Sequence, residues 1–290
     1  MVKLHIKFGD ESQYLFETTC SIAVGELLPQ LVAIYNGRLK IERLSSEIEN
    51  LAEYGIALPP NMQGLADEQI EDLKLVDEWA TKCYPSGGSD LNKDPMSRRS
   101  GNAPKDNMKE VLKRTVSEVK NSVSKTQVAA NVCITEDDIQ EGLRRLQGAV
   151  TIVYPMGLPP HDPIKLEFEN KEDLSGQQAA LKILENDTAQ LWWAGKEMQK
   201  NKKLGDYIGK NEKTKIIAKL QKRGLGAPAR EPVFSEEEQK KMMAFAYRRQ
   251  EQMKKLDEAS QNDYLNSQWS DPNALKRNFH NLNDVSWRPH

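Results

Sequence analysis

The sequence predicts an α+β protein: an N-terminal discontinuous β-grasp (ubiquitin-like) unit that carries a long helical insertion, followed by a mostly α-helical C-terminal region. Three observations predict this class. The chain opens with two segments of strand pattern, a segment of helical pattern follows them at once, and the next strand-like run comes only after residue 147. A β-grasp unit needs such a late strand, because it lies parallel to the first one in the same sheet.

The first three elements follow from the spacing of apolar residues. From Val2 to Phe8 apolar residues alternate with polar ones, which predicts a half-buried strand. A turn at residues 9–10 separates it from a second strand over residues 13–18. Apolar residues then recur at helical spacing over residues 24–34, and Gly37 predicts the end of that helix.

The strand that closes the sheet is predicted far along the chain. Residues 149–154 form a short β-branched run of the kind that a central strand needs. We expect this run to pair in parallel with the first strand, and residues 165–168 to add an edge strand. Residues 37–147 then form the long helical insertion within a domain that spans residues 1–172.

The insertion contains several segments of helical pattern and one linker. Apolar residues recur at helical spacing over residues 41–51, 70–76, 108–119 and 139–146. A capping box at Thr135 and Asp138 predicts the start of the last of these helices, and Gly148 predicts its end. Residues 84–107 are rich in Pro, Gly, Ser and Asp and predict a flexible linker.

Residues 173–290 predict a helical, basic C-terminal region with an aromatic tail. Trp192 and Trp193 fall within a helical pattern, in which neighbouring residues point about 100° apart. A short basic helix is predicted over residues 216–220. A longer helix is predicted to begin with a capping box at Ser235. Its apolar stripe consists of Met242, Phe245, Met253 and Leu256.

Charge and cysteine content narrow the function classes. The net charge of the 290 residues is −2, but residues 191–290 hold 20 Lys and Arg against 13 Asp and Glu. The N-terminal part of the chain is therefore acidic and the C-terminal part is basic, which indicates that the two parts bind different partners. A pI near 6.2 argues against a dedicated nucleic-acid binder. Three scattered cysteines favour a reducing compartment over a disulfide framework. We expect neither a signal peptide nor a membrane span.

The residues do not predict an enzyme. His161, beside Asp162 in a proline-rich loop, could act as a general base, although a rigid turn is the simpler interpretation. Residues 205–211 approach a phosphate-binding loop, but the glycine spacing is one residue short and Asn211 replaces the required hydroxyl. No Cys/His cluster or acidic loop predicts a metal site. We therefore expect no catalytic residue, no cofactor and no metal.

Binding to other proteins is the function that the residues favour. Residues 196–223 contain ten Lys and Arg, which could bind an acidic surface of a partner. The alternative interpretation is that these residues form a solvated face of a helix. Aromatic residues are frequent binding anchors, and those of the tail either meet a partner or fold back on their own domain. The candidate partner-binding residues are Trp192, Trp193, Lys210, Lys213, Lys215, Lys219, Trp269 and Trp287.

The sequence resembles the Kurly family of cilia- and flagella-associated proteins over nearly its whole length. Three of the most specific stretches are YNGRLK at residues 35–40, LPPNMQGL at 58–65 and GAVTIVYPMGLPPHDPI at 148–164. Further specific stretches cover residues 168–174, 189–194, 206–215 and 226–232. Residues 89–99 and 257–263 depart from the family's usual pattern.

The resemblance implies a non-enzymatic factor needed for motile cilia, which acts in cytoplasmic assembly of outer dynein arms and in planar orientation of cilia. It implies as partners other dynein-arm assembly factors, including the zinc-finger MYND-containing one, and chaperone machinery. The implied locations are the cytoplasm, the cytoskeleton and the basal body of the cilium. The alternative, which the basic segment favours, is a structural microtubule-associated protein that binds tubulin at the basal body or axoneme. A nucleotide-using enzyme is a third interpretation.

Overall fold

The computed structural model describes residues 1–229 and 236–266, and the chain divides into two compact units. The first unit spans Met1–Arg230 and the second spans Glu231–His290. Helix α8 (Glu236–Asn266) is the described element of the second unit, and its apolar stripe from Met242 to Leu256 is exposed. The domain boundary that we placed after residue 172 falls inside the first unit.

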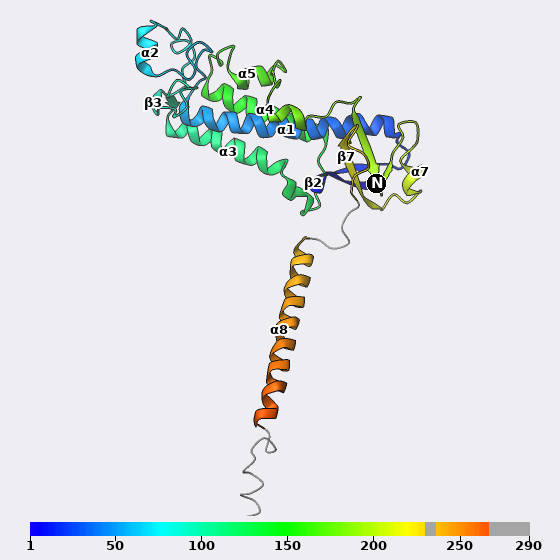
Figure 1. Ribbon diagram of the computed structural model, residues 1–290. Helices are drawn as coiled ribbons and strands as arrows, with labels where there is room; N and C mark the ends of the chain where they lie inside the picture. The colour runs from blue at the N-terminus through cyan, green and yellow to red at the C-terminus, as the bar shows by residue number, and fades with distance from the viewer. Residues whose placement is uncertain (230–235, 267–290) are drawn as a thin grey trace, which may run out of the picture. The chain divides into compact units, whose positions relative to one another are not determined.

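A five-stranded sheet lies at the end of the first unit where helix α1 begins (Figure 1). Its strand order is β2-β1-β7-β5-β6, and the strands are β1 (Val2–Phe8), β2 (Glu11–Thr18), β5 (Ala189–Trp193), β6 (Lys196–Glu197) and β7 (Lys215–Lys222). Strand β1 runs antiparallel to β2 and parallel to β7, whereas β5 runs antiparallel to both β7 and β6. The predicted discontinuous sheet is therefore present, and we interpret its topology as a β-grasp.

The strand that closes this sheet is not the one that the sequence predicted. Residues 149–153 form the last turns of helix α4 (Glu136–Val153), so the prediction of a strand there was wrong. Leu146, Ala149, Val150 and Val153 recur at helical spacing and are all buried. Burial of this face outweighs the preference of β-branched residues for strands.

Two further predictions of secondary structure were also wrong. Residues 216–220 lie in strand β7 and not in a helix, because Ile216, Ala218 and Leu220 alternate into the core at the period of a strand. Residues 165–168 lie in helix α5 (Pro163–Phe168) and not in an edge strand. Asp162 caps this helix and Pro163 occupies its first turn, where an amide proton is not needed.

Helix α1 (Val24–Tyr54) is a single helix of 31 residues where we expected two. Helices α3 (Asp106–Ser122) and α4 pack along it, while its first turns face the sheet (Figure 1). The predicted starts of α3 and α4 agree with the structure, and the capping box at Thr135 is present. The sheet and the three helices share one apolar core.

The remaining elements are short. They are α2 (Asp67–Asp72), β3 (Ser89–Leu91), β4 (Asn102–Pro104), η1 (Lys125–Val128), α6 (Gln178–Lys182) and α7 (Gly205–Ile208). Residues 84–107, predicted as a flexible linker, contain the β3–β4 hairpin. Ala103 and Arg99 of this segment are buried, so the segment is packed on the domain. None of the described helices has the length and apolar character to cross a membrane.

Gly37 and Gly148, both predicted as helix ends, lie inside helices and give a matched test of the helix packing. A Cβ atom on Gly37 would lie 2.5 Å from Ile139 Cγ2, so α1 and α4 approach each other at this glycine. We expect Gly37→Ala to lower the free energy of unfolding by about 1 to 3 kcal/mol. Gly148 is exposed, and a Cβ atom at this position would contact no neighbouring residue within 4 Å.

Gly148→Ala should instead raise the free energy of unfolding by roughly 0.5 to 1 kcal/mol, because alanine favours the helical backbone. Urea denaturation of both variants followed by circular dichroism measures the two effects. Equal stability of the two variants would show that α4 does not pack closely against α1 at Gly37.

Candidate interaction surface

One face of the sheet carries basic and aromatic side chains. Alternate residues of a strand point to opposite faces, and the set that includes Leu4, Ile6 and Ala218 is buried in the core that the sheet shares with α1. The other set lies on the opposite face. It includes Lys3, His5 and Lys7 in β1, Lys215, Ile217 and Lys219 in β7, and Trp192 in β5. In β2 the same face carries Glu17 opposite Lys3, and Leu15, which is fully buried, opposite His5. We call this set the basic sheet face.

Strand register places like charges next to each other on this face. Lys3 lies opposite Lys215, and Lys7 lies opposite Lys219. Facing like charges destabilise a sheet unless negative charge is supplied from elsewhere. Between the two pairs, Ile217 is 39% exposed and offers an apolar contact. Glu17 supplies negative charge opposite Lys3, and Asp10 pairs with Lys219, so exposed Lys215 and Ile217 are the groups best suited to a partner surface that combines acidic and apolar groups.

Lys219 is one candidate residue that the structure removes from the binding surface. Its side chain is 6% exposed. The Nζ atom donates to Asp10 Oδ1 at 3.1 Å and to the carbonyl oxygen of Ala229 at 2.9 Å. Because its charge is already paired inside the fold, Lys219 is less accessible to a partner than the exposed candidates Lys210, Lys213 and Lys215. The sequence did not reveal the position because the segment was assigned to a helix.

Trp192 and Trp193 are neighbours in strand β5, so they point to opposite faces rather than 100° apart. Trp193 is half-buried and packs against the core. Trp192 lies opposite Lys219 on the basic sheet face, and it is half-buried. Its indole Nε1 is buried and has no hydrogen-bond acceptor among the described residues. Of the two tryptophans, Trp192 is the one placed to meet a partner.

Lys210, Lys213 and Lys215 come together at the start of β7. All three side chains are exposed. Asn211 shapes the loop before β7, because its Oδ1 accepts the Lys213 amide proton at 3.1 Å and its carbonyl accepts the Thr214 hydroxyl at 2.9 Å. Lys210 and Lys213 belong to the loop that leads into Lys215, the first residue of β7. Trp269 and Trp287, the other two candidates, lie outside the described residues.

The segment that approaches a phosphate-binding loop is used for internal contacts. The amide of Gly205 donates to the carbonyl oxygen of Cys20 at 2.8 Å, and the amide of Gly209 donates to that of Gly205 at 2.8 Å. A phosphate-binding loop instead directs such amides at the ligand. Helix α7 begins at Gly205, and of the three residues before it only Lys203 forms an isolated β-bridge, to Ala23, so no strand precedes the loop.

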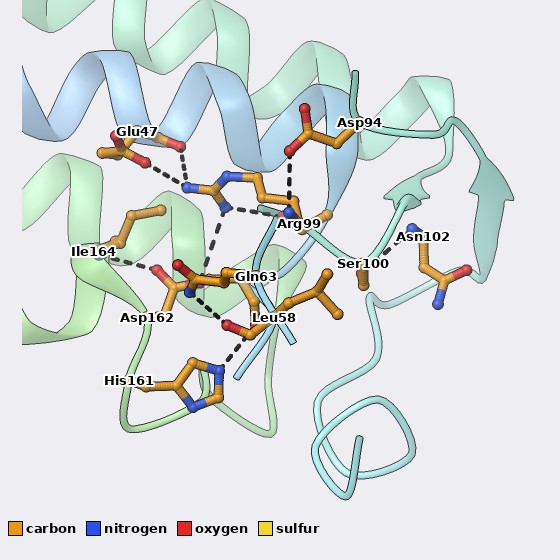
Figure 2. A network of polar contacts seen from close by, with 12 residues as sticks. Glu47, Leu58, Gln63, Asp94, Arg99, Ser100, Asn102, His161, Asp162 and Ile164 are labelled. Atoms are coloured by element: carbon orange, nitrogen blue, oxygen red, sulfur yellow. Dashed lines mark hydrogen bonds and ion pairs between the residues drawn. The ribbon is translucent and has the colours of Figure 1, made fainter. Parts of the chain in front are cut away.

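His161 belongs to a polar network that joins three loops around Arg99 (Figure 2). Arg99 Nη1 donates to the carbonyl oxygen of Gly55 at 2.9 Å, and its Nη2 donates to Glu47 Oε2 at 2.6 Å. The Asp162 carboxylate is fully buried, 3.9 Å from Arg99 Nη1. His161 Nε2 lies 3.0 Å from the carbonyl oxygen of Ala57, so the ring is directed at the main chain.

The carboxylates of this network accept hydrogen bonds from backbone amides. Asp162 accepts from Ile164 N at 2.9 Å and from Ala57 N at 3.1 Å. Asp94 accepts amide protons from Met96 and Arg99 in the loop after β3. Burial raises the pKa of Asp162, against the opposing effect of the Arg99 guanidinium. The network therefore fastens residues 55–66, 92–101 and the start of α5 to each other.

No cluster of His, Cys, Asp and Glu in the described part of the chain could hold a metal ion. Cys20, Cys83 and Cys133 are free thiols. Sequence reasoning missed Arg99 altogether, because it falls in the segment predicted as a linker. Asp162 did have a recognisable signal, since Asp followed by Pro is typical of a helix start.

Comparison with known proteins gives a consistent result along the whole chain. Residues 189–285 match the family model described as cilia- and flagella-associated protein 298. The protein of that name in Homo sapiens is 59% identical over 289 residues, and that in Danio rerio is 58% identical, with 100% of both chains covered. The Drosophila melanogaster protein is 47% identical and covers 99% of both chains. No solved structure matches the chain.

Proposed function

Because this chain belongs to the family of cilia- and flagella-associated protein 298, also called Kurly, we propose that it is a non-enzymatic factor for the cytoplasmic assembly of outer dynein arms. The chain is a cilia- and flagella-associated protein. Its proposed partners are other dynein-arm assembly factors, including the zinc-finger MYND-containing one, and chaperone machinery. Its proposed places of action are the cytoplasm and the basal body, with a second role in orienting cilia within the epithelial plane.

The observation that supports a binding function most is the basic sheet face. Aligned lysines, an exposed isoleucine and a tryptophan with an unsatisfied N–H lie together on a rigid sheet. Tryptophan is enriched among the residues that carry most of the energy of protein interfaces. A partner that supplies carboxylates to the lysines and an apolar group to Ile217 would match this face.

A structural microtubule-associated protein is the second candidate function. The density of lysine in residues 196–223 favours it, since tubulin tails are acidic. The lysines do not form one helical face, however, because the segment folds into β6, α7 and β7. Lys219 is bound to Asp10 within the fold. The positive charge left for a microtubule is smaller and more dispersed than the sequence suggested.

A double charge reversal separates the two functions. We expect Lys213→Glu with Lys215→Glu to reduce capture of dynein-assembly partners from the cytoplasm of ciliating cells about tenfold or more, and to leave axonemes without outer arms. Exposed Lys74 and Lys105 provide a matched control, because reversing both adds the same charge away from the basic sheet face.

Cosedimentation with microtubules is the second measurement. At physiological salt, where charges are screened beyond about 8 Å, we expect weak binding of the unmodified protein. Two results would reject the assembly function in favour of the structural one: stoichiometric cosedimentation that resists salt, and outer arms that are still present after depletion of the protein.

A further inference from the structure

A groove of about 600 Å³ lies between helix α1, helix α5 and residues 172–182. This volume is within the range of about 300 to 1,000 Å³ that is usual for ligand sites. The groove has an apolar lining from Leu39, Leu166 and Leu174, each of which remains partly exposed. It shares no residue with the basic sheet face.

Carboxylates outnumber the basic groups of this groove. Its acidic lining consists of Glu42, Glu47, Glu167, Glu172 and Asp173, against Arg43 and Lys182. Arg43 is shared, because its Nε donates to Glu167 Oε1 at 2.7 Å while its NH2 lies 3.8 Å from Glu172 Oε1. Burial first, and the charge of Glu172 in addition, raise the pKa of Glu167 against the effect of Arg43. Glu47 is compensated by Arg99 from outside the groove, which leaves Glu42, Glu167, Glu172 and Asp173 against Arg43, Lys182 and the nearby Lys40. A small excess of negative charge therefore remains in the groove.

Glu172 is the least satisfied of these acids. Its Oε1 lies 3.6 Å from Lys40 Nζ, which is long for a charged hydrogen bond. Its Oε2 is buried and has no hydrogen-bond partner among the described residues. A buried carboxylate oxygen without a donor is costly. Because the Glu172 side chain is still 23% exposed, a cation that enters the groove can pair with its carboxylate, and a small rotation of the side chain would bring Oε2 to that cation.

We propose that the groove binds a short basic segment of a partner protein, in which an arginine or lysine stands next to a branched apolar residue. The apolar side chain lies on Leu39, Leu166 and Leu174, and the cationic group pairs with the carboxylate of Glu172, whose side chain is 23% exposed. The proposal goes beyond the function above, because the groove selects positive charge while the basic sheet face selects negative charge. The two surfaces therefore recognise different partners or different parts of one partner.

The test uses the full chain and a fluorescent peptide of about ten residues in which leucine and arginine alternate. A peptide with glutamate in place of arginine is the control. By fluorescence anisotropy at physiological salt, we expect saturable binding of the arginine peptide below about 1 mM, and none of the glutamate peptide. Glu172→Gln keeps the shape of the side chain and should weaken binding roughly tenfold.

Glu169→Gln is the matched control, since Glu169 is exposed, lies outside the groove and loses the same charge. Leu174→Ser should also weaken binding, because it removes apolar contact without any change in charge. Equal binding by the Glu172→Gln and Glu169→Gln variants would overturn the proposal, as would absence of saturable binding to the unmodified chain. The Lys213→Glu, Lys215→Glu variant should keep its affinity within about twofold, so failure of the groove and failure of the basic sheet face are distinguishable.

Discussion

Arg99→Ala is expected to lower the free energy of unfolding of the first unit by about 3 to 5 kcal/mol. The guanidinium is buried and contacts three acceptors, the carbonyl oxygen of Gly55 and the carboxylates of Glu47 and Asp162. Its removal leaves the Asp162 charge buried without a cation and an acceptor unpaired. Chemical denaturation at pH 7 measures the loss. Arg98→Ala is the control, because Arg98 is the neighbouring arginine and is exposed.

The same variant has a predictable pH dependence. Burial raises the pKa of Asp162 in the folded protein above the value of about 3.9 for an unfolded aspartate. The folded state therefore binds the proton first as pH falls, and protonation stabilises it relative to the unfolded state. We expect the destabilisation by Arg99→Ala to shrink as pH is lowered from 7 toward this raised pKa. A loss that does not change with pH, or one equal to that of Arg98→Ala, would show that Arg99 does not compensate Asp162.

Ile6→Asp is expected to unfold the sheet. Ile6 is fully buried in β1, the strand that lies between β2 and β7, and it faces Ala218 in the parallel pair. A charge without a partner at this position costs more than about 4 kcal/mol, which approaches the whole stability of a typical domain. Hydrogen exchange of the β7 amides should become as fast as that of a disordered peptide, although β7 lies about 200 residues further along the chain.

Lys3→Asp tests whether this effect depends on the face of the strand. Lys3 lies in the same strand with its side chain on the basic sheet face, opposite Lys215. Lys3 also lies opposite Glu17 in β2, so an aspartate there gains an opposite-charge pair with Lys215 and loses one with Glu17. We therefore expect little change in stability, within about 1 kcal/mol. If Lys3→Asp unfolds the protein as Ile6→Asp does, the assignment of the two faces is wrong.

The hairpin, the helix after it and the need for a late parallel strand could be predicted from the sequence. The identity of that strand could not, because two runs competed for the role. The run at residues 149–153 has the β-branched composition of a strand, but its buried residues follow the period of a helix. The run at residues 215–222 alternates like a strand, but its lysines suggested a solvated helix. In both cases the period of the buried residues decides, and composition misleads.

The stretch at residues 35–40 shows a second limit. The sequence marked it as specific without revealing a role, because each residue contacts a different distant segment. The Asn36 side chain forms two hydrogen bonds with the backbone of Leu184, Gly37 admits Ile139, and Arg38 Nε donates to the carbonyl oxygen of Val123 at 2.9 Å. Contacts of such long range have no local pattern. The candidate site was limited likewise, since only the fold separates exposed Lys215 from paired Lys219.

The distance in sequence between β1 and β7 also determines when this protein can fold on the ribosome. Strand β1 is synthesised long before its parallel neighbour, which is complete only at Lys222. At about 5 to 20 residues per second, the first hairpin waits roughly 10 to 40 seconds with one edge unpaired. An unpaired strand edge is prone to aggregation during that time, so the nascent chain is a natural client for chaperones. A premature stop codon anywhere before β7 yields a chain that cannot complete the sheet.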